Sequence, residues 1–336
     1  MSPIFSPVRR RRGRRRTTTT FALLGAFSLG VAACGSSSTS TATATTATPS
    51  TASTATSVPS TSTAASGVYA PARAALPASL KASGVLDVAT DGTFPPYAFV
   101  QPGTTTIVGY EADFARAIAQ EMGLKVVFNN MAFAGLIPAV QSGRDQIAMS
   151  GLEDTPVREK IVSLVDDLVA HNGFVIKTAD KAKFTTFNDL CGQAVGDVIG
   201  SVSVTVVNDE SATCKSLGKP AIIQKEFPDA GTTLTALESG QVVAQMETFP
   251  GAPYEQQQSH DALTAVPVTT GYSANFVTGE AILPSNTQLI NATQIALQHL
   301  VDDGQYKTIL SRYGISLQQD GATQIIVNWQ THGFTG

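Results

Sequence analysis

With 336 residues and a mass of 35.0 kDa, 43% of them hydrophobic, the chain can bury one large core or two medium ones, which excludes wholly disordered chains and disulfide miniproteins. Seven of the 22 lysines and arginines are arginines within the first sixteen positions, so a product that begins at Cys34 keeps 15 basic against 26 acidic residues. A surface this acidic repels phosphate backbones, and we expect no nucleic-acid partner.

Residues 1–33 are typical of a secretory signal peptide. A run of arginines precedes a mostly apolar stretch, Phe21–Ala33, which is too short to cross a hydrocarbon core of about 30 Å. Small residues then lead into Cys34, as in a bacterial lipobox, where the cysteine receives a lipid. We therefore expect a lipid anchor on Cys34 and a location outside the cytoplasm, at the outer face of the cytoplasmic membrane. The alternative is an ordinary signal peptide followed by a chance cysteine.

Residues 34–74 form the next segment, the lipidated cysteine and a tether. From Gly35 to Ser66 the chain is almost entirely Ser, Thr and Ala with a few prolines. Such a composition offers too little apolar surface to fold, so we expect disorder.

The remaining chain alternates between strand and helix patterns. Strands are predicted near 85–89, 125–128, 146–149, 173–176 and 193–196, and helices near 113–122, 135–141, 232–239 and 288–310. This order indicates βαβ units. We expect an α/β fold of two Rossmann-like lobes with mixed, mostly parallel sheets and a ligand held between them.

No sequence feature favours catalysis or a cofactor. The nucleophile-elbow, zincin, phosphate-loop and dinucleotide motifs are absent, and the four histidines show no metal-ligand spacing. We therefore expect no enzyme activity, no cofactor and no metal. Once Cys34 is lipidated, Cys191 and Cys214 remain, and an even number in an oxidising compartment predicts a disulfide, with two free buried thiols as the alternative.

A local pattern around Arg158 indicates an anion site. Thr155 and Pro156 are a plausible helix cap and first helical residue, which places Arg158 in the first turn beside free N–H groups. A guanidinium there can hold a carboxylate. Alternatively, Arg158 pairs with Glu153 or Asp154, and this window alone favours neither reading.

Six windows, taken in order, resemble a known family. The chain is similar to the bacterial solute-binding proteins of ABC importers, specifically the polar amino-acid family with the type II periplasmic-binding fold, over about residues 80–316. The resemblance implies lobe 1 at 75–173 plus 272–336, lobe 2 at 174–271, and two hinge crossovers between them. The windows are Asp91–Tyr97, Gly109–Phe114, Phe133–Pro138, Ser150–Arg158, Leu190–Ser201 and Asp303–Tyr306.

The resemblance also implies a binding site. Arg158 would clamp a ligand α-carboxylate, helped by N–H groups near Gly151 and, from lobe 2, near Ser201 and Val202. Two aromatic rings would sandwich the ligand side chain, with an aspartate at the pocket edge. The implied ligand-binding residues are Asp91, Phe94, Phe133, Ser150, Gly151, Glu153, Arg158, Ser201, Val202 and Thr248.

Two positions depart from the family pattern. Glu153 stands where a hydroxyl usually donates to the ligand carboxylate, and Thr248 stands where an aspartate usually binds the ligand ammonium. Either Glu153 takes over the ligand's cationic group, or it neutralises Arg158 and leaves a different ligand or none. Glu247 could also supply the missing charge, but strand alternation points it away from the face of Thr248, so we rank it lower.

The sequence thus predicts a monomeric, membrane-anchored solute-binding protein that delivers a small carboxylate-bearing solute, an amino acid or derivative, to an ABC permease. Because no acidic cluster is evident, we expect a small neutral or polar side chain on that solute. The alternatives are a sensory ligand-binding protein and a lyase-like enzyme on the same fold, in which Glu153 would be the acid or base. The stretch 321–336, with Trp329, is expected to pack on lobe 1 without a predicted role.

Overall fold

The computed structural model describes residues 67–268, 276–316, 321–328 and 331. The predicted signal peptide, Cys34 and most of the predicted tether lie outside these residues, as does Trp329. Within the described residues, no helix combines the length and the apolar character needed to cross a membrane.

A continuous path of paired strands organises the described chain. Its order is β5-β1-β6-β12-β7-β10-β8-β9, and β11 and β13 also pair with β7. The strands are β1 (Val85–Thr90), β5 (Lys125–Asn130), β6 (Ile147–Ala148), β7 (Ser163–Lys177), β8 (Ala194–Val198), β9 (Ile223–Phe227), β10 (Ala244–Phe249), β11 (Leu263–Pro267), β12 (Phe276–Ile282) and β13 (Gly321–Val327). A separate small sheet contains β2 (Thr93–Phe94), β3 (Ala98–Val100) and β4 (Ile107–Val108).

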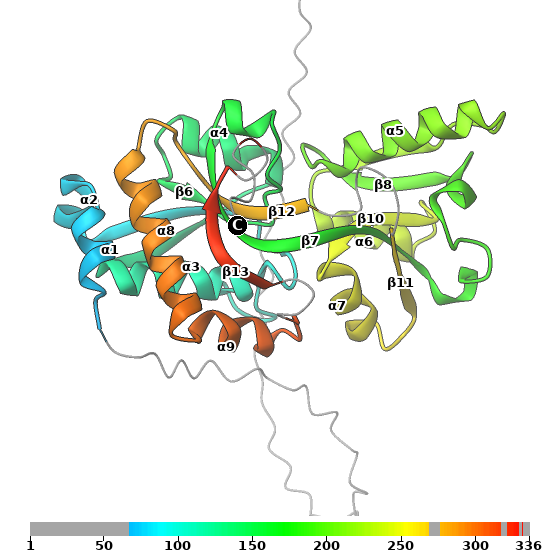
Figure 1. The fold of residues 1–336 in the computed structure, drawn as a ribbon. Helices are drawn as coiled ribbons and strands as arrows, with labels where there is room; N and C mark the ends of the chain where they lie inside the picture. Colours follow the sequence, from blue (N-terminus) through cyan, green and yellow to red (C-terminus); the bar gives the residue numbers. More distant parts are fainter. Residues whose placement is uncertain (1–66, 269–275, 317–320, 329–330, 332–336) are drawn as a thin grey trace, which may run out of the picture. The chain divides into compact units, whose positions relative to one another are not determined.

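Helices flank both ends of this path, and Figure 1 shows them in two groups joined by β7 and β12. One group accompanies β1, β5 and β6, and the other accompanies β8, β9 and β10. The helices are α1 (Ala70–Ala75), α2 (Ala78–Ser83), α3 (Tyr110–Met122), α4 (Leu136–Gln141), α5 (Ser203–Ser216), α6 (Ala230–Glu238), α7 (Gly251–Gln258), α8 (Thr287–Asp302) and α9 (Gln305–Arg312). The predicted α/β fold class is confirmed.

Strand β7 belongs to both groups. It pairs antiparallel with β12 as far as Ala170 and with β10 from His171 onward. Pairing is parallel on either side, between β1 and its neighbours β5 and β6 and between β8 and its neighbours β9 and β10. The chain therefore changes sheet partners near the boundary expected at residue 173. We keep the names lobe 1 and lobe 2, with the bounds given above, for the two groups.

Two predicted helices differ from the structure. The helix expected over 288–310 is divided into α8 and α9, because Gly304 adopts a left-handed conformation with φ of 83°. The helix expected to begin at Pro156 is a single 3₁₀ turn over Arg158–Lys160, and the Thr155 hydroxyl accepts from the Arg158 N–H at 3.2 Å. Thr155 therefore caps a turn rather than a full helix.

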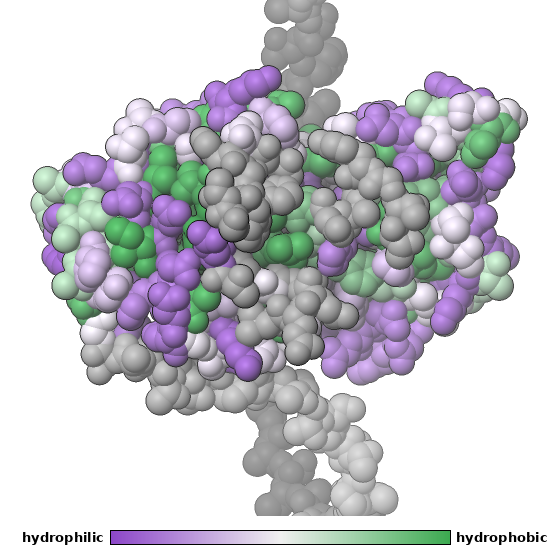
Figure 2. Space-filling model, in the orientation of Figure 1, coloured by the Kyte–Doolittle hydropathy of each residue, from purple (hydrophilic) through white to green (hydrophobic). Residues whose placement is uncertain are grey.

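Each lobe has its own apolar core. In lobe 1, Phe114 of α3 stacks on Tyr306 of α9 with ring centroids 5.0 Å apart, and Ile325 of β13 joins the same core. In lobe 2, Phe174 of β7 packs with residues of α5. The face shown in Figure 2 mixes hydrophilic residues with smaller apolar patches, as on most globular proteins.

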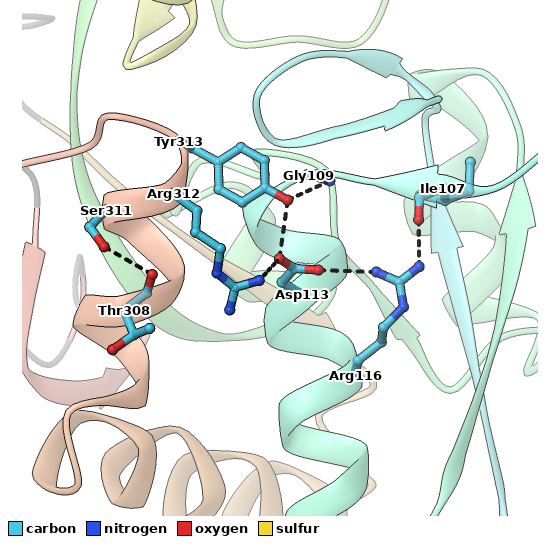
Figure 3. A network of polar contacts seen from close by, with 8 residues as sticks. All are labelled: Ile107, Gly109, Asp113, Arg116, Thr308, Ser311, Arg312 and Tyr313. Carbon is cyan, nitrogen blue, oxygen red and sulfur yellow. Dashed lines mark hydrogen bonds and ion pairs between the residues drawn. The ribbon is translucent and has the colours of Figure 1, made fainter. Parts of the chain in front are cut away.

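A polar network fixes α9 against α3 (Figure 3). Asp113 accepts from Arg312 at 2.7 Å and from the Tyr313 hydroxyl at 3.1 Å, while Arg116 approaches its other oxygen at 3.3 Å. The Tyr313 hydroxyl in turn accepts from the Gly109 N–H at 3.2 Å. This network ties the last helix of lobe 1 to the segment between the small sheet and α3.

The predicted disulfide is confirmed. Cys191 and Cys214 are bonded with an S–S distance of 2.05 Å and a sequence separation of 23. The bond joins the residue that follows the 3₁₀ turn Phe187–Leu190 to α5, inside the core of lobe 2.

Replacing both cysteines with alanine should lower the free energy of unfolding. The chain-entropy model gives about 3 kcal/mol for a loop of this length, because the bond restricts the unfolded chain. Urea denaturation of the wild type and the double variant measures the difference. Coinciding transition midpoints would contradict the expected stabilisation.

Three buried carboxyl groups lie close to the crossover. Glu111 lies in the first turn of α3, Asp167 lies on β7 and Glu280 lies on β12, and their exposed fractions are 2%, 1% and 1%. Burial raises the pKa of Asp167 to about 7 and raises the pKa of Glu111 and Glu280 well above the usual range, with mutual repulsion adding to the shift. Neither carboxyl oxygen of Glu280 has a hydrogen-bond partner among the described residues.

These shifts predict that the protein loses stability as the pH rises from about 5 to about 8. Folded carboxyl groups with raised pKa hold protons that the unfolded chain releases, so their contribution is present at low pH and is lost as the pH passes their folded pKa. Glu280→Gln should reduce the slope by as much as about 1.4 kcal/mol per pH unit, the limit for a single proton. Thermal unfolding across this range, with the exposed Glu226→Gln as control, measures it; equal slopes in all three proteins would contradict the assignment.

Candidate functional site

A pocket lies where the two lobes face each other. It encloses about 520 Å³ of space between the protein atoms, a figure that includes its open mouth. Lobe 1 contributes five lining residues and lobe 2 contributes eight. They are Asp91, Phe94, Phe133, Gly151 and Glu153 from lobe 1, and Val198, Ser201, Val202, Ser203, Ala230, Met246, Glu247 and Thr248 from lobe 2.

Aromatic rings form the lobe 1 wall. Phe94 stacks on Tyr97 with ring centroids 4.4 Å apart and planes 5° apart. Gly151 passes under these rings with φ of 61°, and an added Cβ would lie 2.8 Å from Phe94. The wall therefore requires a glycine at 151, both for its left-handed conformation and for the close approach.

Asp91 is held by its neighbours. Its carboxylate accepts from the Thr93 N–H at 3.1 Å, from the Thr93 hydroxyl at 2.7 Å and from the Phe133 N–H at 3.1 Å. Burial raises its pKa, and the Thr93 bonds oppose this shift. Asp91 therefore orients the turn that carries Phe133, besides lining the pocket edge.

Glu153 places a buried carboxyl group in the pocket. It is 5% exposed, and its Oε2 has no hydrogen-bond partner among the described residues. Burial raises its pKa to about 7, although the charge of Arg158 opposes the shift. Leaving a carboxylate oxygen without a partner in a buried site is costly unless a ligand supplies a donor.

Glu247 brings a second carboxyl group to the same pocket from lobe 2. It is 3% exposed, accepts from the Thr248 N–H at 2.7 Å and from the Gln245 amide at 3.2 Å. Burial is the main cause that raises its pKa to about 7, and the charge of Glu153 adds to it. The charge of Glu153 therefore acts on Glu247 across the pocket.

Glu247 lines the pocket together with Thr248, although strand alternation predicts that it points away from the face of Thr248. Strand alternation sets only the direction of the bond from Cα to Cβ. Beyond Cβ, the Glu247 side chain accepts a hydrogen bond from the N–H of the following residue, Thr248, and both residues line the pocket. Thr248 itself forms a hydrogen bond to the Tyr97 hydroxyl at 2.8 Å, which joins lobe 2 to lobe 1.

Arg158 lies beside the pocket and is not among its lining residues. One guanidinium nitrogen donates to the Glu153 carbonyl at 2.8 Å and another to the Gly200 carbonyl of lobe 2 at 3.1 Å. Its guanidinium lies 5.7 Å from the centre of the Phe133 ring. Arg158 therefore bonds main-chain carbonyls in both lobes, and among the described residues it forms no ion pair with Glu153.

Two further groups that were predicted to contact the ligand form hydrogen bonds within the protein. The Gly151 N–H donates to both carboxyl oxygens of Glu111, at 2.8 and 3.0 Å. The Ser150 hydroxyl bonds the main chain of Asp91 and does not line the pocket. Neither group faces the pocket as a free donor.

The amino end of α5 forms the opposite wall. Val202 precedes the helix without a side-chain cap, and Ser201 and Ser203 line the pocket beside it. The Ser201 N–H donates to the Val198 carbonyl at 3.0 Å, and its hydroxyl has no partner among the described residues. A helix amino end carries a partial positive charge of about half a unit.

The structure thus brings eight of the ten predicted residues to one pocket and leaves Ser150 and Arg158 outside its lining. The pocket also contains Val198, Ser203, Ala230, Met246 and Glu247, which the sequence reasoning did not select. Glu247 had a usable signal, a carboxylate next to the position where the family keeps one. The others are small or apolar residues without a distinctive pattern.

A group with metal-like spacing lies elsewhere in lobe 1. Glu121, His299 and Asp303 approach one another, although the spacing of the histidines in the sequence does not indicate a metal site. His299 pairs with Glu121 at 2.9 Å and stacks on Tyr69. None of these residues lines the pocket.

Known proteins are similar to this chain in sequence and in fold. Residues 86–316 match the model of bacterial extracellular solute-binding proteins, family 3. A curated relative, the arginine-binding protein ArgT of Corynebacterium glutamicum, is 30% identical over 72% of this chain and 78% of its own length.

Solved structures of amino acid-binding proteins are also similar to this chain. An ancestral arginine-binding protein bound to arginine is 30% identical with a TM-score of 0.62, covering 68% of this chain and 98% of its own. An ancestral amino acid-binding protein described as a precursor of cyclohexadienyl dehydratase is 26% identical with a TM-score of 0.62, covering 70% and 97%. The family match spans more than half of the chain, and the chain therefore belongs to the bacterial extracellular solute-binding proteins of family 3.

Proposed function

We propose that this protein captures a cationic amino acid or a close derivative outside the cytoplasm and delivers it to an ABC importer. The observation that carries this proposal is the pair of buried carboxyl groups, Glu153 and Glu247, which face one pocket from opposite lobes. A cation between them would pair both charges and give the free oxygen of Glu153 a donor.

This proposal replaces the neutral side chain expected from the sequence. That expectation rested on the apparent lack of an acidic cluster, and Glu247 supplies the second member of one. The relatives support the change, since ArgT is named as an arginine-binding protein and the ancestral protein was solved with arginine. Phe94 and Phe133 provide ring faces on which a guanidinium plane can stack.

Capture in this family type depends on lobe closure, and two direct hydrogen bonds support the closed arrangement. Tyr97 reaches Thr248, and Arg158 reaches the Gly200 carbonyl, each from lobe 1 to lobe 2. A cation that bonds Glu153 of lobe 1 and Glu247 of lobe 2 adds a third link. Because it binds the closed form better than the open form, it shifts the population toward closure.

We further propose that Cys34 carries the lipid that holds the monomeric protein at the outer face of the cytoplasmic membrane, near its permease. The support is the sequence pattern of residues 1–66, an arginine-rich start, a short apolar stretch and a Ser/Thr/Ala-rich tether. The protein would perform no chemistry on the solute.

An enzyme is the second candidate, and one observation favours it. A pKa of about 7 suits Glu153 for proton transfer at neutral pH, and one structural neighbour is a precursor of a dehydratase. Incubating the protein with its ligand and recovering that ligand unchanged would exclude this candidate. Time-dependent conversion would establish it.

Glu247→Gln should weaken the binding of arginine and lysine. The amide keeps the shape of the side chain but removes a charge, and loss of a charge-assisted bond in a buried site costs roughly 1.5–3 kcal/mol, or about 10-fold to 150-fold in Kd. Isothermal titration calorimetry of the wild type and variant with arginine, lysine and glutamine measures this. The exposed Glu226→Gln variant of lobe 2 is the matched control.

Glutamine binding that exceeds arginine binding in the wild type would contradict the cationic assignment. So would a Glu247→Gln variant with unchanged affinity for both cations. In either case the pocket would select its ligand without using the acidic pair.

Affinity for a cation should also rise with pH from about 5.5 to about 8. Glu153 and Glu247 have pKa values of about 7 and bind a cation when ionised, so protonation below pH 7 competes with the ligand. Each proton that must leave gives up to about a tenfold change in Kd per pH unit. Titrations at several pH values measure the slope, and Glu153→Gln should flatten it; a pH-independent Kd would contradict this coupling.

A further inference from the structure

We infer that Thr248 is a positioning residue that slows the release of the bound solute, because its hydroxyl is the middle member of a hydrogen-bond chain from Tyr97 of lobe 1 to the carboxylate of Glu247 in lobe 2. The inference rests on the proposed function, in which the protein captures a solute by closing its lobes. It concerns the closure itself and not the groups that contact the solute.

The chain has one direction. The Thr248 N–H and hydroxyl both donate to Oε1 of Glu247, at 2.7 and 3.3 Å, and the Tyr97 hydroxyl lies 2.8 Å from the Thr248 hydroxyl. A threonine hydroxyl has a single proton to donate. Since that proton points to Glu247, the Tyr97 hydroxyl is the donor to Thr248, and the chain ends on the carboxylate.

The lobe 1 end of the chain is fixed in place. The Tyr97 ring lies against Phe94 and Tyr110, with centroids 4.4 and 5.0 Å away, and its exposed fraction is 0%. Burial raises the pKa of Tyr97 well above its usual value, so the hydroxyl keeps the proton that it donates. Thr248 is also buried, at 7% exposed. Because the two hydroxyls belong to different lobes, the lobes cannot separate without breaking this bond.

The carboxylate at the other end strengthens the chain. A hydrogen bond to an ionised acceptor is stronger than one between neutral groups, and successive hydrogen bonds polarise one another. A bound cation favours the ionised form of Glu247, so the chain is strongest when the pocket is occupied. The solute enters while the lobes are apart and the bond is absent, and the chain therefore acts on dissociation rather than on association.

Stopped-flow kinetics with arginine as the probe test this role in the wild type, Tyr97→Phe, Thr248→Val and the double variant. Tyr97 does not line the pocket, and phenylalanine keeps the ring. Each single change should raise the dissociation rate constant about 3-fold to 10-fold, the range for one buried hydrogen bond, and leave the association rate constant unchanged. The double variant should release arginine no faster than the faster single variant, because either change breaks the same bond.

Effects that multiply in the double variant would show that Thr248 acts on the solute without Tyr97, and would overturn the inference. Thr248→Ser keeps the hydroxyl and should keep the wild-type rate. If Thr248→Val lowers the melting temperature but releases arginine at the wild-type rate, the bond is only structural and the inference fails.

The failure of the proposed function has a different signature. If the wild type binds glutamine and not arginine, the cationic assignment fails, and the same four proteins measured with glutamine decide the inference, since Tyr97 does not line the pocket. If the wild type binds neither amino acid, both the proposed function and the inference are overturned.

Discussion

The site depends on a charge imbalance in a buried space. Glu153 and Glu247 enter the pocket from different lobes, both nearly excluded from solvent, and no basic side chain among the described lining residues compensates them. Burial pushes both pKa values to about 7, so that without a cation the pocket resists full ionisation. A bound cation favours the ionised form of both carboxyl groups. It can pair with both of them only when the two lobes are close together. Under the proposed function, the binding of a cationic ligand and the closure of the lobes therefore involve the same two carboxyl groups.

Arg158 has a structural role next to these two acidic groups. Burial lowers its pKa, and the charges of Glu153 and Asp154 oppose the shift, which keeps a charged guanidinium beside the acidic pocket. Its hydrogen bonds, however, go to main-chain carbonyls, one of them across the cleft. Together with the bond between Tyr97 and Thr248, this makes the closed arrangement partly independent of the ligand. Thr248, where the resemblance implies an aspartate for the ligand ammonium, instead forms part of this link between the lobes.

The sequence predicted the architecture well because the information is local. Val85–Thr90, Tyr110–Met122 and Lys125–Asn130 carry regular apolar patterns, and Gly123 ends its helix in the left-handed conformation typical of a glycine there. The order of motifs also placed eight of ten predicted residues at one pocket. What could not be predicted is the direction in which side chains bend after Cβ. Glu247 bonds its strand neighbours Thr248 and Gln245, and Arg158 bonds main-chain carbonyls, one of them in lobe 2; neither outcome follows from the apolar pattern of the sequence.

The acidic groups at the crossover connect the hinge to the pocket wall. Glu111 holds the N–H of Gly151, whose left-handed conformation sets the wall under Phe94, and repulsion from Asp167 on β7 acts on Glu111. Asp167 in turn acts on Glu280 of β12, the second strand of the crossover. A change of backbone position in either crossover strand therefore alters the charge environment of the group that fixes the wall. In this protein the strands that belong to both groups and the wall of the pocket share one set of buried carboxyl groups.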